Sequence, residues 1–354
     1  MNRHPLNPLL SPADLSPSHP ELTVIGVFNA GAVIFQGQVL LLLRVAETAL
    51  KDHQIGIPLM NRNNEITIKL LNPKEDHEFD YSDSRFVAYK KANQNGRVAY
   101  LTSLSHLRVA RSDDGVHFTI DETPILPEGL YENFGIEDPR ITQIGDTFHI
   151  VYTSVSSRGV SVSRMTTQDF IHFERNGVIF PPENKDVVLF PEKINGRYVA
   201  YHRPVPFGIG GLNIWSATSD NLTDWGHHQC IARADDFGYL NGRIGAGAPP
   251  IKTSLGWLHI FHGADAKHRY ELSAFITDFN DHTLITHFLK HPLLKPEAPY
   301  ELTGFFDHVV FSCGVVVKGD IVYIYYGAAD STLALAHIPM ADLLGDMLPY
   351  EYID

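Results

Sequence analysis

Short apolar runs, rich in aromatic and β-branched residues, recur along the chain, and each follows a glycine closely. Examples are GDTFHIVYTS, GWLHIFHGA and GDIVYIYYGAAD. Successive glycines of the set lie between 49 residues (Gly96 to Gly145) and 63 residues (Gly256 to Gly319) apart. A second apolar run closely precedes several of them, and two such runs joined by a short glycine-containing turn predict a β-hairpin. The six glycines are Gly37, Gly96, Gly145, Gly196, Gly256 and Gly319.

A third strand is predicted after several of these hairpins. The segments VARSDDGVHF, VSRMTTQDFIHF and WSATSDNLTDW each combine a short strand, a Ser/Thr/Asp turn and an aromatic residue. Helical periodicity is confined to the tail near Met340 to Leu344. Three or four strands repeated about every fifty residues are typical of the blades of a β-propeller. We therefore expect an all-β chain, with residues 1–354 forming a single β-propeller domain.

The repeat leaves two points open. A pair of all-β sandwiches is the alternative architecture, because sandwiches also consist of many short strands. The number of blades is five or six, since residues 47–80 are irregular and are also compatible with an insertion.

Composition and charge narrow the class of partner. The chain has 28 Lys and Arg against 41 Asp and Glu, a formal net charge of −13, which argues against nucleic acid and anionic membranes as partners. A small cationic pocket for a small anion stays compatible with this balance. The two cysteines, Cys230 and Cys313, are too few for a disulfide framework and predict two buried thiols. With no apolar run of signal-peptide or membrane-span length, we expect a soluble cytoplasmic protein.

Charged and polar residues stand at the predicted strand ends. The inner strands of a propeller converge on its axis, so such residues share one central pocket. One or two of them would be solvated loop residues or salt bridges between blades, but their recurrence predicts a central polar site. They are Asn29, Arg44, Glu137, Asp138, Arg140, Lys185, Asp186, Glu192, Lys193, His202, Arg203, Arg243, His262 and Asp330.

Five segments carry a resemblance to a known family. These segments are FNAGAVIFQGQVLLLLR, FGIEDPRIT, NKDVVLFPEKINGRYVAYHRP, RIGAGAPPIKTSLGWLHIFHG and YYGAAD. They resemble the mannoside phosphorylases and mannosidases of glycoside hydrolase family 130. The resemblance runs from about Asn29 to Asp330. It implies a five-bladed β-propeller, with six blades as the less favoured count. It also implies mannosides and inorganic phosphate as partners, with no metal site and no other cofactor.

The resemblance assigns a role to each matching residue. Asp138 in FGIEDPRIT would be the single general acid, passing its proton through a hydroxyl of the bound mannosyl unit, and Glu137 and Arg140 would orient the site. Ser84 stands where the family commonly has Pro, so the match at Arg85 is looser. The mannosyl-binding residues would be Asn29, Arg44, Arg85 and Asp330. The phosphate-binding residues would be Lys185, Arg203, Arg243 and His262.

The four cationic positions decide between two reactions of this family. An inverting hydrolase needs a second carboxylate that activates water, whereas a phosphorylase needs cationic groups that hold phosphate. The basic set favours phosphorolysis, giving α-mannose 1-phosphate reversibly, and β-1,2-linked mannobiose or mannooligosaccharides are favoured over β-1,4-linked ones. An inverting β-mannosidase and a non-catalytic sugar-binding propeller stay as alternatives. If the basic residues had a purely structural role, they would pair with Asp186, Glu192 or Asp236. The sequence leaves open whether the chain forms a homo-oligomer.

Overall fold

The computed structural model describes residues 1–51, 54–90 and 97–350, which form an all-β fold with a few short helices. The helical segments are η1 (Pro12–Asp14), η2 (Ala234–Phe237), α1 (Pro299–Leu302) and α2 (Met340–Gly345). The position of α2 confirms the helical tail predicted near Met340 to Leu344. Among the described residues, no helix combines the length and the apolar character that a membrane span requires.

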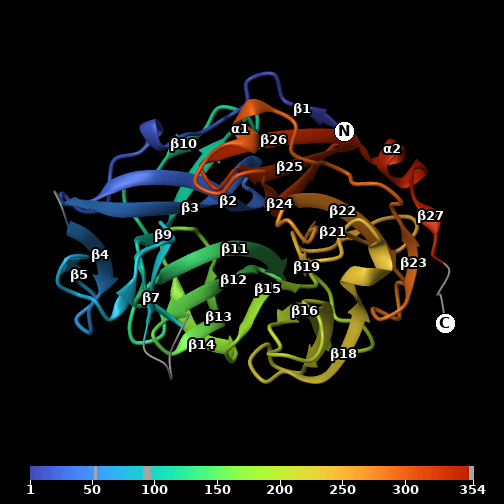
Figure 1. Ribbon diagram of the computed structural model, residues 1–354. Coiled ribbons are helices and arrows are strands. Elements are labelled where there is room, and N and C mark those ends of the chain that lie inside the picture. The colour runs from blue at the N-terminus through green and yellow to red at the C-terminus, as the bar shows by residue number, and fades with distance from the viewer. Residues whose placement is uncertain (52–53, 91–96, 351–354) are drawn as a thin grey trace.

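Most strands lie in five groups, which Figure 1 shows spread around a common centre; groups I and II are joined into one sheet by a parallel contact between Gly135 and Ser105. Group I contains β2 (Thr23–Phe35), β3 (Gln38–Lys51), β9 (Ser103–Ser112) and β10 (Thr119–Ile120). Group II contains β11 (Gly135–Ile144), β12 (Thr147–Ser156), β13 (Gly159–Thr167) and β14 (Glu174–Phe180). Group III contains β15 (Asn184–Leu189), β16 (Tyr198–Pro204), β17 (Ile214–Ser219) and β18 (Gly226–Ala232).

The last two groups bring both ends of the chain into sheets. Group IV contains β19 (Arg243–Ala246), β20 (Ile251–Lys252), β21 (Trp257–Ala264), β22 (Tyr270–Thr277), β23 (Ile285–Phe288) and β27 (Leu348–Pro349). Group V contains β24 (Val310–Lys318), β25 (Ile321–Ala328), β26 (Thr332–Pro339) and β1 (Asn2–Arg3). Because β1 pairs with β26 in antiparallel register, the N-terminal strand completes a sheet made by the C-terminal strands.

The predicted hairpins are present where their glycines lie in the described residues. Antiparallel pairs join β2 to β3 at Gly37, β11 to β12 at Gly145, β15 to β16 at Gly196, β20 to β21 at Gly256 and β24 to β25 at Gly319. The remaining glycine, Gly96, lies outside the described residues. The sequence prediction of repeated short antiparallel strands is therefore confirmed.

The apolar core is divided among the interfaces between neighbouring groups. In β3, Leu41 and Leu43 pack with residues of group V, whereas Leu40 and Leu42 pack with residues of group II. Alternate side chains of a strand point to opposite faces, so the continuous apolar run of this strand serves two cores at once. Further clusters join group II to III, III to IV and IV to V.

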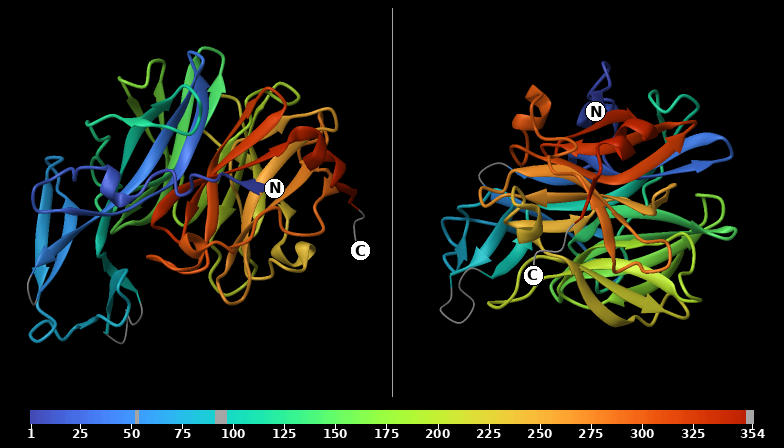
Figure 2. Two further views of the ribbon diagram at one scale, coloured as in Figure 1. Left: turned by 90° about the horizontal axis from the view of Figure 1, so that it is seen from above. Right: turned by 90° about the vertical axis from the view of Figure 1, so that its right-hand side faces the viewer.

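A segment inserted between β3 and β9 lies to one side of these groups. It contains β4 (Gln54–Met60), β5 (Ile66–Leu71), β6 (Phe79–Asp80), β7 (Phe86–Tyr89) and β8 (Val98–Leu101). These strands have a small apolar cluster of their own. Figure 2 shows them at one end of the molecule, away from groups III to V. The irregular stretch of the sequence is therefore an insertion.

The prediction for the two thiols is correct for one residue and wrong for the other. Cys313 is buried, whereas Cys230 is exposed. Cys230 lies in β18, the outermost strand of group III, where residues 227–230 are all exposed.

Candidate active site

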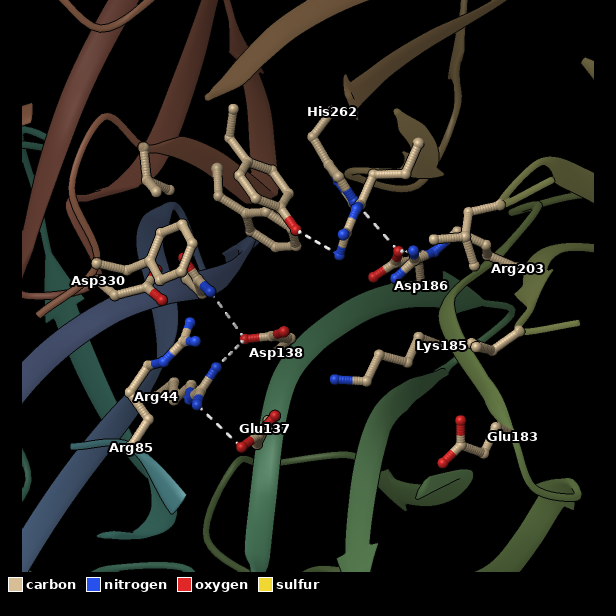
Figure 3. Close-up of a pocket in the computed structure, with 18 residues that line it drawn as sticks. Arg44, Arg85, Glu137, Asp138, Glu183, Lys185, Asp186, Arg203, His262 and Asp330 are labelled. Atoms are coloured by element: carbon tan, nitrogen blue, oxygen red, sulfur yellow. Dashed lines mark hydrogen bonds and ion pairs between the residues drawn. The ribbon is translucent and has the colours of Figure 1, made fainter. Parts of the chain in front are cut away.

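A cavity of about 380 Å³ opens where the inner strands of the groups meet. Its size is within the usual range for small-molecule sites. The sequence-predicted site residues come from elements far apart in the chain, and Figure 3 shows their side chains directed into this space. All nine line the cavity: Asn29, Arg44, Arg85, Asp138, Lys185, Arg203, Arg243, His262 and Asp330.

A recurring backbone irregularity places several of these side chains. The pairing register shifts in β2 after Phe28, in β11 after Glu137 and in β15 after Lys185. The next residue in each strand has a positive φ: 46° at Asn29, 51° at Asp138 and 54° at Asp186. Asn and Asp tolerate this left-handed conformation better than other non-glycine residues. A bulge redirects a side chain, so each strand turns one polar group towards the centre.

Asp138 lies in a closely bonded cluster on one side of the cavity. Its Oδ1 accepts hydrogen bonds from Asn29 Nδ2 and from Arg44 NH1, both at 2.9 Å. The other terminal nitrogen of Arg44 donates to Glu137 Oε1, also at 2.9 Å. Burial raises the pKa of Asp138, but Arg44, Arg140 and the bond from Asn29 outweigh it and hold the pKa below its ordinary value. The unliganded protein therefore carries Asp138 as a carboxylate at neutral pH.

Asp330 is a contrasting carboxyl group on the same side of the cavity. Among the described residues, its side chain has no hydrogen-bond partner. Burial raises the pKa of Asp330 to about 6. The negative charges of Asp138 and Glu137 act in the same direction, and the positive charge of Arg44 opposes them. Asp330 therefore changes its charge in the physiological pH range.

Arg85 reaches the cavity from the insertion, just before β7, but it is already engaged. Its NH2 group lies 2.7 Å from Asp83 Oδ2, and its guanidinium lies 4.8 Å from the centre of the Phe306 ring. Its side chain keeps 39% of its surface exposed. Arg85 is thus placed at the rim, while Asn29, Arg44 and Asp138 are deeper.

The four basic residues gather on the opposite side of the cavity. Lys185 extends towards Asp138 (Figure 3), and its Nζ has neither a hydrogen bond nor an ion pair within the described part of the chain. Arg243 NH1 donates to Tyr270 Oη at 3.2 Å, and Arg243 NH2 lies 3.1 Å from His268 Nδ1. Neither residue pairs with a carboxylate in the described structure, so two cationic groups face the cavity without a counter-ion.

Arg203 and His262, in contrast, share a carboxylate. Asp186 Oδ2 lies 2.7 Å from Arg203 Nε and 3.1 Å from His262 Nε2. Burial lowers the pKa of His262, against the opposing effect of Asp186, and Arg203 and His262 hold the pKa of Asp186 well below its usual range. The pairing with Asp186 considered from the sequence therefore exists for these two residues. Glu192 and Asp236 pair instead with Lys252 and Arg233.

Several cavity residues were not among the predicted site residues. Tyr270 lines the cavity, and Glu183, Phe306 and Phe311 also contribute to the wall. No local motif marks these four positions, because each follows from how the strand groups meet.

Arg140 is buried and donates to Asp186 Oδ1 at 3.1 Å and to the Asp138 carbonyl at 3.0 Å. This contact agrees with the orienting role predicted for it.

Across residues 1–51, 54–90 and 97–350, no group of three or more His, Cys, Asp or Glu side chains is arranged to hold a metal ion. What the cavity offers is hydrogen-bonding groups for hydroxyls on one side and positive charge on the other.

Comparison with known proteins agrees with this arrangement. A β-1,2-mannobiose phosphorylase of Listeria innocua is 45% identical over 97% of this chain and 97% of its own length. A 1,2-β-oligomannan phosphorylase of a Thermoanaerobacter species is 36% identical over 77% of this chain and 96% of its own length. A solved structure of β-1,2-mannobiose phosphorylase from Listeria innocua in complex with β-1,2-mannobiose has a TM-score of 0.92 and 44% identity, and the alignment covers 98% of both chains.

A family model of mannoside phosphorylases also matches this chain, although its description names the β-1,4 linkage. The model, described as β-1,4-mannooligosaccharide phosphorylase, matches residues 85–348, from the rim arginine of the insertion to the last described strand. The chain belongs to glycoside hydrolase family 130.

Proposed function

We propose that this protein is a glycoside phosphorylase that cleaves β-1,2-linked mannobiose or mannooligosaccharides with inorganic phosphate. The products are α-mannose 1-phosphate and the shortened acceptor, and the reaction is reversible. The observation that carries the proposal is the placement of Lys185, Arg203, Arg243 and His262 in one cavity with Asp138. The names and the identities of the two curated relatives support the β-1,2 linkage.

The mannosyl unit would bind on the side of Asp138. Asn29, Arg44 and Asp330 offer an amide, a guanidinium and a carboxylate, which suit the paired hydroxyls of a sugar through charge-assisted hydrogen bonds. Arg85 and Phe306 would border the unit at the rim. Because Asp138 already accepts bonds from Asn29 and Arg44, its carboxylate is held in a fixed position for the leaving group.

Protons are conserved over the proposed reaction. Asp138 would deliver a proton to the glycosidic oxygen through a hydroxyl of the mannosyl unit while a phosphate oxygen forms the new bond to the anomeric carbon. When HPO₄²⁻ attacks, the proton that it carries is released and replaces the proton that Asp138 gives to the acceptor. The reaction therefore consumes no proton from the solvent. Asp138 is ionised without ligands, and a phosphate dianion beside it raises the pKa of a carboxyl group. Binding of phosphate therefore favours the protonated acid.

Hydrolysis by the same fold is the alternative carried from the sequence. It would require a carboxylate that activates water. Asp186 is poorly suited to that task, since both of its oxygens face cationic groups. Glu183 would be the candidate base in the described cavity. The unpaired positive charge of Lys185 and Arg243 favours an anionic nucleophile over water.

For the architecture, we propose that groups I to V are the blades of a five-bladed β-propeller formed by a single domain. The five apolar clusters support this arrangement, because each joins two consecutive groups and one joins group V to group I. The cytoplasmic location stays a prediction.

One assay tests the reaction. The protein is incubated with β-1,2-mannobiose and with β-1,4-mannobiose, each with and without phosphate, and the products are identified. We expect α-mannose 1-phosphate from the β-1,2 substrate, only when phosphate is present. Free mannose formed without phosphate would indicate the hydrolase, preference for the other substrate would indicate the β-1,4 linkage, and no product would indicate a sugar-binding protein.

A further inference from the structure

Asp186 occupies a position that neither the mannoside nor phosphate explains. It lies in β15 directly after Lys185, with a positive φ of 54°, and only 2% of its surface is exposed. Space for its carboxylate is provided by Gly245 of β19, where a Cβ atom would lie 2.2 Å from Asp186 Oδ2. A strained backbone and an obligatory glycine thus hold a buried negative charge beside a site for an anion.

Two guanidinium groups and one imidazole, from three strands, converge on this carboxylate. Its Oδ2 faces Arg203 Nε of β16 at 2.7 Å and His262 Nε2 of β21 at 3.1 Å, and its Oδ1 accepts from Arg140 NH2 of β11 at 3.1 Å. We propose that Asp186 is the positioning residue of the phosphate site. It orients Arg203 so that its terminal nitrogens donate to phosphate, and it orients His262 so that Nδ1 accepts a hydrogen bond from the hydroxyl of HPO₄²⁻. This inference rests on the proposed phosphorylase function.

For His262, the contact selects one tautomer. A carboxylate oxygen 3.1 Å from Nε2 accepts a hydrogen bond, so the proton of the neutral ring lies on Nε2. Nδ1 has no partner among the described residues. The ring itself lines the cavity and packs on Phe311, with ring centroids 4.0 Å apart. Asp186 and Phe311 together therefore fix the ring and leave Nδ1 as its unused nitrogen.

For Arg203, the contact fixes the inner part of the guanidinium. Asp186 Oδ2 holds Nε in an ion pair at 2.7 Å, although the N–H of Nε is not directed at that oxygen; NH1 and NH2 have no hydrogen-bond partner within the described part of the chain. A guanidinium anchored at one nitrogen keeps its planar fork available, and this fork is suited to two phosphate oxygens. An anchored side chain also loses less conformational entropy when phosphate binds.

A purely structural role for Asp186 makes a different prediction. Its contacts link groups II, III and IV, so removing the charge would lower the melting temperature in either case. Only a positioning role changes the affinity for phosphate while leaving the affinity for the mannoside nearly unchanged. The two roles are therefore separated by the two Michaelis constants.

The test uses Asp186→Asn, which keeps the shape of the side chain and removes its charge. Its KM for phosphate is measured at saturating β-1,2-mannobiose, and its KM for β-1,2-mannobiose at saturating phosphate. We expect the KM for phosphate to rise about tenfold or more, the scale of one lost charge-assisted hydrogen bond, and the KM for β-1,2-mannobiose to stay close to the wild-type value. Equal changes in both constants, or an unchanged KM for phosphate, would overturn the proposal.

Glu301→Gln is the matched control. Glu301 is fully buried, lies 2.7 Å from Arg3 Nε and accepts from Tyr326 Oη, away from the cavity. This variant should lower the melting temperature without a selective change in the KM for phosphate. A selective rise in the control would show that loss of any buried carboxylate has this effect and would overturn the proposal.

A second variant covers the case in which Asp186→Asn does not fold. Gly245→Ala keeps every charge but places a methyl group against Asp186 Oδ2 and His262 Nε2. The same selective rise in the KM for phosphate is expected, and an unchanged value would contradict the proposal. The reaction itself is judged separately on the wild-type protein, since turnover that needs no phosphate would refute the phosphorylase function whatever the variants show.

Discussion

The two sides of the cavity use charge in opposite ways. On the side of Asp138, every arginine is bonded to a carboxylate: Arg44 bonds Glu137 and Asp138, and Arg85 bonds Asp83. On the other side, Lys185 and Arg243 have no carboxylate partner in the described structure, and Arg203, His262 and Arg140 share the single carboxylate of Asp186. The first side has no unpaired arginine, whereas the second has a surplus of positive charge.

The difference shows how one cavity distinguishes two substrates. Hydroxyl groups are neutral and would be bound beside arginines that are already bonded to carboxylates, so no positive charge is left unpaired when the sugar departs. An anion supplies the missing charge itself, and repulsion among unpaired cations falls when it binds. The mannoside and phosphate are therefore expected to respond to different substitutions, in the following order of effect.

The largest effect is expected from Asp138→Asn. This change keeps the hydrogen-bonding shape beside Asn29 and Arg44 but removes the group that transfers the proton. Turnover should fall by roughly 10²–10⁴-fold, the usual contribution of general acid catalysis. The rate is measured at saturating β-1,2-mannobiose and phosphate, with the melting temperature as the check on folding. Activity above about a tenth of the wild-type level would refute the assignment.

Lys185→Met should act on the other side of the cavity. Because Nζ has no partner among the described residues, the substitution leaves no buried group unpaired in the free protein. Loss of one charge-assisted hydrogen bond to phosphate should raise the KM for phosphate about tenfold or more. The KM for β-1,2-mannobiose should change little. A similar rise in both constants would mean that the two sides do not act independently.

A fall in pH should weaken the binding of β-1,2-mannobiose, because Asp330 gains a proton. Its pKa is raised to about 6, so the group is ionised above that pH and gains a proton as the pH falls through it. The protonated form loses charge-assisted bonding to hydroxyls, and affinity for β-1,2-mannobiose should fall about fivefold.

Calorimetry without phosphate measures this effect, because phosphate titrates in the same range. Affinity should decline between pH 7 and pH 5 in the wild type. Asp330→Asn should bind more weakly at neutral pH and show no such decline. A decline that persists in the variant would assign the titration to another group.

The smallest effect is expected from Arg85→Ala. The side chain is well exposed and is held by Asp83 at the rim, and contacts of this kind contribute about 0.2–1 kcal/mol. The KM for β-1,2-mannobiose should therefore rise no more than about fivefold. An increase of a hundredfold would place Arg85 among the principal sugar-binding residues.

The sequence was informative where a local pattern has one structural meaning. The leucines of β3 and the glycine-containing hairpins predict short strands buried on both faces, and the structure has them. Most of the strand-end residues also converge as expected, because the inner strands point to one centre, whereas Glu192, Lys193 and His202 do not line the cavity. Asp186 was noticed at a strand end, but its three partners lie on strands brought together only by folding, and no spacing in the chain reveals them.

Other features depend on how separate segments pack. Phe306 meets Arg85 only because the loop after α1 lies beside the insertion. Gly245 is required by a side chain nearly sixty residues earlier. Cys230 is exposed because its strand is the outermost of its sheet. These are tertiary relations, which a single sequence does not encode in any local period.

The pairing of β1 with β26 has a consequence for how the molecule forms during synthesis. Asn2 and Arg3 leave the ribosome long before their partners in the sheet, His337 and Ala336, are made. At about 5–20 residues per second, β1 waits roughly 17–67 s for these partners. Until then β26 does not exist, and the sheet of group V cannot take up β1. Completion of this sheet is therefore a late event that follows translation of β26.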